Sequence, residues 1–176
     1  MKTDIETLLL LKEAGKIEEK EFLGIFRESS EENAPAWYPE LSGEAALQKY
    51  EDGFFTYMRG PFFAEGGILA ILRDEEHYRS SLRLYPYGAE NCFLVEAFET
   101  RPDSRKLGFG KRLYEAVIAQ LEKEYGQIEL LADVYKTNTA SIAAHLSSGF
   151  VREKEYWEEG DGTRNEKKVT MAYRTE

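Results

Sequence analysis

The chain has 176 residues and a formal net charge of −10 at pH 7; 42% of its residues are hydrophobic and 13% are aromatic. That apolar content is enough for a folded domain and argues against disorder. One cysteine and two histidines exclude a disulfide framework and argue against a metal site, so we expect no metal. The acidic balance disfavours nucleic acid and anionic membranes as partners and leaves room for a cationic one.

The first third of the chain is helical in pattern. Four residues fit one face of a first helix that ends at Gly15, namely Ile5, Leu8, Leu9 and Lys12. A second helix is predicted over 17–28. The prolines and small polar residues of 29–41 predict a loop. The run Leu8–Leu11 is too short for a signal peptide or a membrane span, so a reduced cytoplasm is the simplest compartment.

A third helix is predicted after Ser42, whose hydroxyl could cap it. Its apolar residues recur every three or four positions, at Leu47, Tyr50, Phe54 and Tyr57. Gly53 weakens this pattern, and a strand over 54–58 is the alternative.

After Gly66-Gly67 the periodicity becomes that of strands. The predicted elements are strands over 68–73, 78–85 and 93–98, a long helix over 109–125, a strand over 128–134, a short helix over 138–148, and a hairpin of 150–157 with 167–173. This order predicts an α/β or α+β domain with a mixed central sheet of about six or seven strands, flanked by helices.

The most informative segment, Arg101 to Arg112, connects a strand to the long helix. Gly108 and Gly110 remove side chains where a ligand could approach the main chain. The first amides of the helix lack intrahelical acceptors and carry partial positive charge. Five bases and one acid occupy this segment, so it predicts an anion site, most often for phosphate. The alternative is that these bases simply solvate the start of the helix.

Two familiar phosphate loops do not fit this segment. A Walker loop requires Ser or Thr where Arg112 stands, and a dinucleotide fingerprint requires glycine where Leu113 stands. A third interpretation is that this segment binds the pyrophosphate arm of coenzyme A.

Two motifs carry a family resemblance. Arg105-x-x-Gly108-x-Gly110, preceded by Pro102-Asp103, resembles the acetyl-CoA loop of the GNAT superfamily of N-acetyltransferases. Further along, Asn138-x-x-Ser141-x-x-x-His145-x-x-x-Gly149-Phe150 resembles a later helix of that superfamily. The resemblance covers about 67–173. It implies an acyl-CoA N-acyltransferase (GNAT-like) fold in a single domain of 1–176, with a mostly helical part over 1–60 and a CoA-binding sheet core over 67–173.

The resemblance also implies where acetyl-CoA binds. The strand that ends near Thr100 would part from the strand over 128–134, and the pantetheine arm would lie in the gap. The implied binding residues are Phe98, Glu99 and Thr100 through their main chain, Leu107, Gly108, Phe109, Gly110 and Lys111 around the pyrophosphate, and Arg105, Lys106, Asn138 and Ser141. Asn138 could instead be a helix cap, and Ser141 a small packing residue.

Glu96 is the first candidate for the base that deprotonates the acceptor amine, because a carboxylate in an apolar strand costs energy unless it is used or paired. Glu99 is the second. For either, the alternative is an ion pair with a neighbour such as Arg83 or Arg73. His145 stands where the family often has tyrosine. It could protonate the departing thiolate, or it could be packed and hydrogen-bonded locally.

The implied function is an N-acetyltransferase that moves an acetyl group from acetyl-CoA to a primary amine of a small molecule or a protein, by direct attack in a ternary complex. The alternative is a non-catalytic acyl-CoA-binding or protein-interaction module on the same fold. The negative charge favours a cationic amine, and members of the family often form homodimers. Four aromatic residues are candidates either for an acceptor pocket or for the core, namely Trp37, Tyr38, Tyr156 and Trp157.

Overall fold

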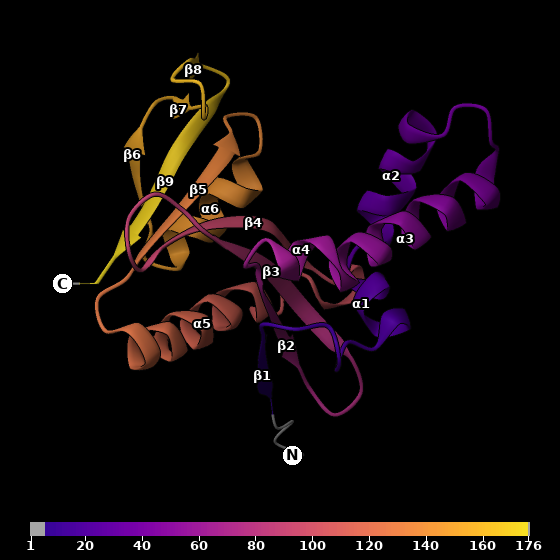
Figure 1. Cartoon of the computed structure of the whole chain (residues 1–176), viewed down its shortest axis with the longest axis horizontal. Helices are drawn as coiled ribbons and strands as arrows, with labels where there is room; N and C mark the ends of the chain where they lie inside the picture. Colours follow the sequence, from indigo (N-terminus) through magenta and orange to yellow (C-terminus); the bar gives the residue numbers. More distant parts are fainter. Residues whose placement is uncertain (1–5, 176) are drawn as a thin grey trace.

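The computed structural model describes residues 6–175 as a seven-stranded mixed sheet with helices on both faces (Figure 1). The strand order is β1-β2-β3-β4-β5-β9-β6. The strands are β1 (Thr7–Leu11), β2 (Ile68–Arg73), β3 (Tyr78–Pro86), β4 (Cys92–Thr100), β5 (Glu129–Tyr135), β6 (Val151–Lys154) and β9 (Lys168–Arg174), and a small second sheet pairs β7 (Trp157–Glu158) with β8 (Arg164–Asn165). The predicted α/β class with a mixed sheet of six or seven strands is confirmed.

The helices divide between the two faces of the sheet. They are α1 (Glu19–Ile25), α2 (Arg27–Trp37), α3 (Gly43–Arg59), α4 (Pro61–Ala64), α5 (Phe109–Tyr125) and α6 (Thr139–Ser147), with a 3₁₀ turn at Pro102–Ser104. On one face, α5 packs its apolar residues against alternate residues of the strands, as at Leu113, Leu72 and Leu84. On the other face, α1 and α3 pack against the residues between them, as at Phe22, Met58 and Ile71.

The predicted first helix is wrong, because Thr7–Leu11 forms β1 and pairs antiparallel with β2. Leu8 and Leu10 pack into the core beneath α5, whereas Leu9 and Leu11 pack into the core beneath α1 and α3. A strand that contributes to both cores has no polar alternation, so its apolar run resembles a short helix. Ile5 of that prediction lies outside the described residues.

The predicted loop over 29–41 is also wrong as far as Trp37, because Arg27–Trp37 forms α2. Its exposed polar residues support the helix, with an ion pair of 2.7 Å between Arg27 Nε and Glu31 Oε1. The predicted helix over 17–28 is divided between α1 and α2 at Phe26. The third helix is confirmed as α3, and the alternative strand over 54–58 is wrong. Ser42 is its N-cap, but the hydroxyl makes no capping hydrogen bond.

The middle of the sheet is opened by an irregularity in β4. Parallel pairing between β4 and β5 joins Cys92–Leu94 to Glu129–Leu131. Beyond Leu94, no strand of residues 6–175 pairs with β4 on that side. The register between β3 and β4 also shifts: Arg83 faces Glu96, yet Ser81 faces Glu99. The extra residue is a β-bulge in which Ala97 has φ +46°. The two strands therefore part in the middle of the molecule.

Among residues 6–175, no helix is both long enough and apolar enough to cross a membrane.

Candidate active site

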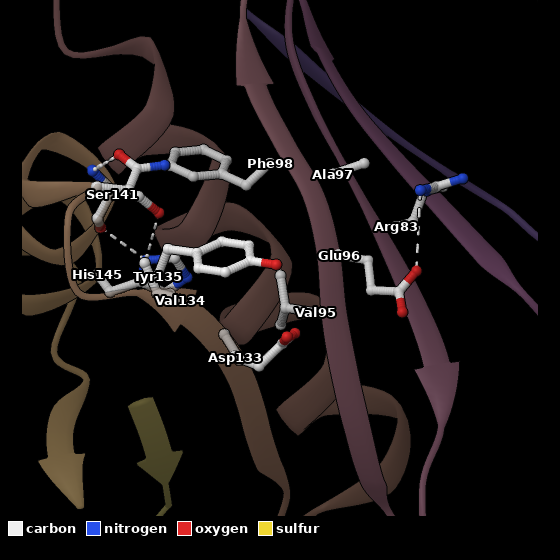
Figure 2. A pocket seen from close by; sticks show the side chains of 12 residues that line it. Arg83, Val95, Glu96, Ala97, Phe98, Asp133, Val134, Tyr135, Ser141 and His145 are labelled. Carbon is white, nitrogen blue, oxygen red and sulfur yellow. Dashed lines mark hydrogen bonds and ion pairs between the residues drawn. The ribbon is translucent and has the colours of Figure 1, made fainter. Parts of the chain in front are cut away.

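A cleft of about 390 Å³ lies where β4 and β5 part (Figure 2). We call it the β4–β5 cleft. Its lining comes from β3, β4, β5 and the region of α6, namely Arg83, Val95, Glu96, Ala97, Phe98, Ala132, Asp133, Val134, Tyr135, Asn138, Ser141 and His145. The sequence-predicted residues Glu96, Phe98, Asn138, Ser141 and His145 thus meet at one cavity. Its walls include unpaired strand edges, which can accept or donate hydrogen bonds to an extended ligand.

The glycine loop meets this cleft at Phe98. Gly108 is the N-cap of α5 and has φ +82°, a conformation that side chains disfavour. At Gly110, a Cβ atom would lie only 2.7 Å from Cζ of Phe98. The first helical hydrogen bond of α5 runs from the Arg112 amide to the Gly108 carbonyl at 3.1 Å. The amides of Phe109, Gly110 and Lys111 precede it and have no intrahelical acceptor.

The bases of this segment mostly meet carboxylates from distant parts of the chain. Arg101 Nη1 lies 3.2 Å from Glu21 Oε2, and Arg112 Nε lies 2.9 Å from Glu6 Oε2. Arg105 pairs with Glu28, and Lys111 lies 3.7 Å from Glu115. Lys106 has no ion pair within the described part of the chain. The excess positive charge seen in the sequence is therefore largely balanced in the fold.

Glu96 is paired, as one sequence alternative proposed. Its Oε2 lies 3.8 Å from Nη2 of Arg83, directly across the β3–β4 ladder, and its side chain is 37% exposed. Figure 2 shows both side chains on the side of β4 away from Phe98 and His145. The pair is long and half-exposed, so the carboxylate stays accessible to a ligand in the cleft.

Glu99 lies on the same face as Glu96, because the bulge falls between them. Burial raises the pKa of Glu99 above its ordinary value and outweighs a hydrogen bond with Ser29, which acts to lower it. Its Oε2 is buried and has no hydrogen-bond partner among residues 6–175. The carbonyl of Glu99 accepts from the Ser80 hydroxyl at 2.8 Å, and that of Thr100 from Arg105 Nε at 3.3 Å.

His145 is only 2% exposed, and both of its ring nitrogens are engaged. Nδ1 lies 2.7 Å from the Ser141 carbonyl, which can only accept, so Nδ1 carries the proton. Nε2 then accepts from the Tyr114 hydroxyl at 2.9 Å. Burial lowers the pKa of His145 and favours this neutral ring. The geometry favours a packed, locally bonded histidine, and its role as an acid stays a prediction.

The start of α6 is capped as one sequence alternative proposed. Asn138 is the N-cap, and its side-chain oxygen accepts from the Ser141 amide at 3.0 Å. Ser141 Oγ lies 3.4 Å from His145 Nδ1 and lines the cleft.

A second cavity of about 550 Å³ shares Arg83 and Glu96 with the cleft, and the sequence indicated only part of its lining. We call it the aromatic pocket. It is lined by Trp37, Tyr38, Tyr50, Gly53, Phe54, Tyr57, Arg83, Tyr85 and Glu96. Trp37 and Tyr38 were expected as candidates, whereas Trp157 lies in a different cavity beside Tyr87. Tyr50, Phe54 and Tyr57 had been assigned only to the apolar face of α3.

Cys92 is buried at the opposite end of β4, where burial raises the pKa of its thiol to about 11. Such a thiol is a poor nucleophile at neutral pH.

Two central strands separate next to a helix whose N-cap is a glycine, and this is the architecture of an acyl-CoA N-acyltransferase. Residues 24–150 match the acetyltransferase (GNAT) family model, so the chain belongs to this family and is an N-acetyltransferase.

The chain is 28% identical over 118 residues to aminoglycoside N(6')-acetyltransferase type 1 of Klebsiella aerogenes. The match covers 63% of this chain and 76% of that enzyme. Two structures share its fold. The PaiA N-acetyltransferase of Thermoplasma acidophilum in complex with coenzyme A has a TM-score of 0.60 and 12% identity, over 96% of this chain and 99% of the other. A mutant of spermidine N-acetyltransferase from Vibrio cholerae has a TM-score of 0.62 and 13% identity, over 96% and 93%.

Proposed function

We propose that the β4–β5 cleft binds the pantetheine arm and thioester of acetyl-CoA, and that a primary amine attacks the thioester directly in a ternary complex. The observation that carries this proposal is the parting of β4 from β5 next to the start of α5. The first amides of α5 would hold the pyrophosphate, since a helix N-terminus offers free N–H groups and partial positive charge. Main-chain groups from Phe98 to Thr100 would bind the extended arm.

Glu96 takes the role of the general base in this proposal. It accepts a proton from the acceptor ammonium, directly or through water, and the neutral amine attacks the thioester carbonyl carbon. A C–N bond forms, the C–S bond breaks, and the thiolate of coenzyme A leaves and takes up a proton. Its exposure and its place between two cavities support this role for Glu96 over Glu99, whose carboxylate is packed beneath α2.

The buried, hydrogen-bonded state of His145 affects which group can protonate the departing thiolate. His145 would have to give up its bond to the Ser141 carbonyl to donate a proton from Nδ1. We therefore expect its first role to be holding α6 against Tyr114. With acetyl-CoA as cosubstrate and a buried thiol, a cytoplasmic setting remains our expectation.

The test has two measurements. Isothermal titration with acetyl-CoA should give saturable binding, and an amine panel should release free thiol together with an acetylated product detected by mass. Glu96→Gln should lower kcat at pH 7 by about 100-fold or more and leave acetyl-CoA affinity unchanged. The loss should shrink as the pH rises toward the pKa of the amine, because the free amine then needs no base.

Glu90→Gln is the matched control, since Glu90 is exposed in the turn before β4. Equal activity of Glu96→Gln and Glu90→Gln would remove Glu96 from the mechanism, and no binding of acetyl-CoA would refute the proposed function as a whole.

A further inference from the structure

The β4–β5 cleft and the aromatic pocket meet at a single pair of charged residues. Arg83 and Glu96 line both cavities, whereas the other residues line only one. A molecule in the aromatic pocket can therefore place one end next to both charges. That end would face the position proposed above for the thioester.

Arg83 is a guanidinium with too few partners. Its side chain is 18% exposed, and its contact with Glu96 at 3.8 Å is too long for a hydrogen bond. Nη1 reaches only the weak acceptor Met58 Sδ at 3.8 Å. Nε is buried without a partner among residues 6–175. A guanidinium has five N–H donors in a planar fork, and its best partner is a carboxylate bound through two parallel hydrogen bonds.

Other unsatisfied polar atoms lie on the same side of the sheet. Ser81 is two residues before Arg83 on β3 and faces Glu99 on β4, so these three side chains share one face. Each has a buried polar atom with no partner in the described region, as does Ser30 of the overlying α2. Unpaired buried polar groups are costly, and their gathering here indicates that a polar ligand or water belongs between β3, β4 and α2.

The charge of the aromatic pocket indicates the type of ligand. Its lining holds one cation and one carboxylate, Arg83 and Glu96, and the remaining residues are uncharged. A polycation would find a single carboxylate, and that carboxylate already faces an arginine. A zwitterion would find one complementary group for each of its charges. The aromatic rings would then receive an apolar body.

We propose that the acceptor is a free α-amino acid with an aromatic or large apolar side chain. Arg83 binds its carboxylate, Glu96 receives the proton of its α-ammonium group, and the aromatic pocket holds its side chain. The α-nitrogen forms the new C–N bond with the acetyl carbon, and coenzyme A leaves with its sulfur protonated. The product is an N-acetyl amino acid. This inference rests on the proposed function and specifies its acceptor.

The test compares amino acids with the same molecules lacking the carboxylate. Thiol release and product mass are measured for L-tryptophan and L-phenylalanine, for tryptamine and phenethylamine, and for spermidine and kanamycin. We expect kcat/KM for each amino acid to exceed that of its matched amine by about 10-fold or more, because a charged hydrogen-bonded pair is lost with the carboxylate. The polycations should be poorer still.

Two substitutions of Arg83 separate its direct contact from its effect on Glu96. Arg83→Gln and Arg83→Lys should lower the ratio of kcat/KM for amino acid over amine by about 10-fold, since lysine keeps the charge but loses the planar fork. Any change in Glu96 affects both substrates and cancels in this ratio. A ratio unchanged in both variants, with the fold intact by circular dichroism, would overturn the assignment of Arg83.

The aromatic pocket has its own matched pair of variants. Trp37 is 69% exposed, so Trp37→Ala can be made without loss of the core, and it should raise KM for L-tryptophan several-fold. Tyr87→Ala removes a surface aromatic residue that does not line the pocket and should leave KM unchanged. Equal changes in KM for the two variants would contradict binding of the amino-acid side chain in the aromatic pocket.

The outcomes for this inference and for the proposed function are distinct. If acetyl-CoA fails to bind, the proposed function fails. If acetyl-CoA binds and the simple amines or polyamines are preferred, or if no amino acid is acetylated, only the amino-acid proposal is overturned.

Discussion

Gly110 stands where the first turn of α5 comes closest to β4. A Cβ atom there would lie 2.7 Å from the Phe98 ring and 3.4 Å from Thr100 Oγ1. We expect Gly110→Ala to push α5 away from β4, to cost about 1–3 kcal/mol of folding free energy, and to weaken acetyl-CoA binding. Chemical denaturation and isothermal titration measure the two effects.

The control for this substitution is Gly160→Ala, because a Cβ atom at Gly160 would have no heavy atom of the described chain within 4 Å apart from its two neighbours in sequence. If the two variants unfold at the same denaturant concentration, the contact with Phe98 does not require glycine.

His145 should make stability depend on pH. Burial lowers its pKa, so the folded protein keeps the ring neutral while the unfolded chain binds a proton below about pH 6.5. Its contribution is therefore present above that pH and is lost as the pH falls toward the lowered pKa of the folded protein. His145→Phe should be less stable at pH 7 by about 1–3 kcal/mol, since Tyr114 loses its acceptor, but should lose less stability on acidification.

Melting temperatures at pH 7 and pH 5 test this expectation, and parallel curves for the two proteins would contradict it. The dependence of kcat on pH tests the separate acid role: an unchanged profile in His145→Phe would exclude it.

For single residues, the sequence predicted the members of the two motifs but not the distant side chains that pair with them. Gly108, Gly110 and Asn138 are visible because short-range spacing carries their pattern. The carboxylates Glu6, Glu21 and Glu28 each pair with a base of the loop that lies at least 77 residues away along the chain, and nothing local marks them. The sequence indicated Arg83 only as a possible ion-pair partner for Glu96 or Glu99, because a lone arginine in a strand gives no sign of its unmet hydrogen bonds.

One carboxylate of α1 makes several polar contacts with the sheet and with the segment that follows β4. Glu21 Oε2 lies 3.1 Å from His77 Nδ1 and 3.2 Å from both the Tyr78 amide and Arg101 Nη1. Burial opposes ionisation of this carboxylate, but these donors together hold the pKa of Glu21 below its ordinary value. Glu21 therefore joins α1 to β3 and to the segment that follows β4.

Glu21→Gln should cost about 1–3 kcal/mol of folding free energy at pH 7, because a charge-assisted network loses its anion. A carboxylate with a lowered pKa stabilises the fold above its unfolded pKa and loses that contribution on acidification. The difference from the wild type should therefore shrink below about pH 4. Urea unfolding at pH 7 and at low pH measures it.

Glu31→Gln serves as the comparison, since Glu31 makes an exposed ion pair with Arg27 within α2, and such pairs are worth about 0.5 kcal/mol or less. Equal losses of folding free energy from the two substitutions would show that the contacts of Glu21 stabilise the fold no more than an exposed ion pair does.

Elements with a clear period were predicted almost to the residue, as with α5 and β2. The two failures have physical causes. β1 contributes to two cores and so lacks alternation, and α2 is a polar helix whose position depends on α3 and on Ala34, its buried contact. Both are set by tertiary packing, which overrides local preference.

On the scale of the whole molecule, the sheet is held between two cores, and its inner strands part along the β4–β5 cleft. A ligand there would join the two halves of the sheet. At 100 times its dissociation constant, acetyl-CoA should add about 2.7 kcal/mol to the folding free energy and raise the melting temperature by about 5–10 °C.

Scanning fluorimetry against acetyl-CoA concentration measures this shift, with ATP at equal concentration as the control for adenine and phosphate alone. The same shift with both ligands would mean that the thioester arm adds nothing, contrary to binding in the cleft. Hydrogen exchange should slow along Val95 to Thr100, where strand edges become covered.

The bulge at Ala97 exchanges the two sides of β4 midway along its length. Before it, Phe93 and Val95 face α5; after it, Phe98 does so, and Glu96 and Glu99 share the opposite face. In a regular strand that kept Ala97, Glu96 and Phe98 would be two residues apart and would face the same side of the sheet. The bulge places them on opposite sides instead. The separation of the proposed acetyl-CoA side of β4 from the proposed acceptor side thus depends on the backbone conformation of one residue, the bulged Ala97.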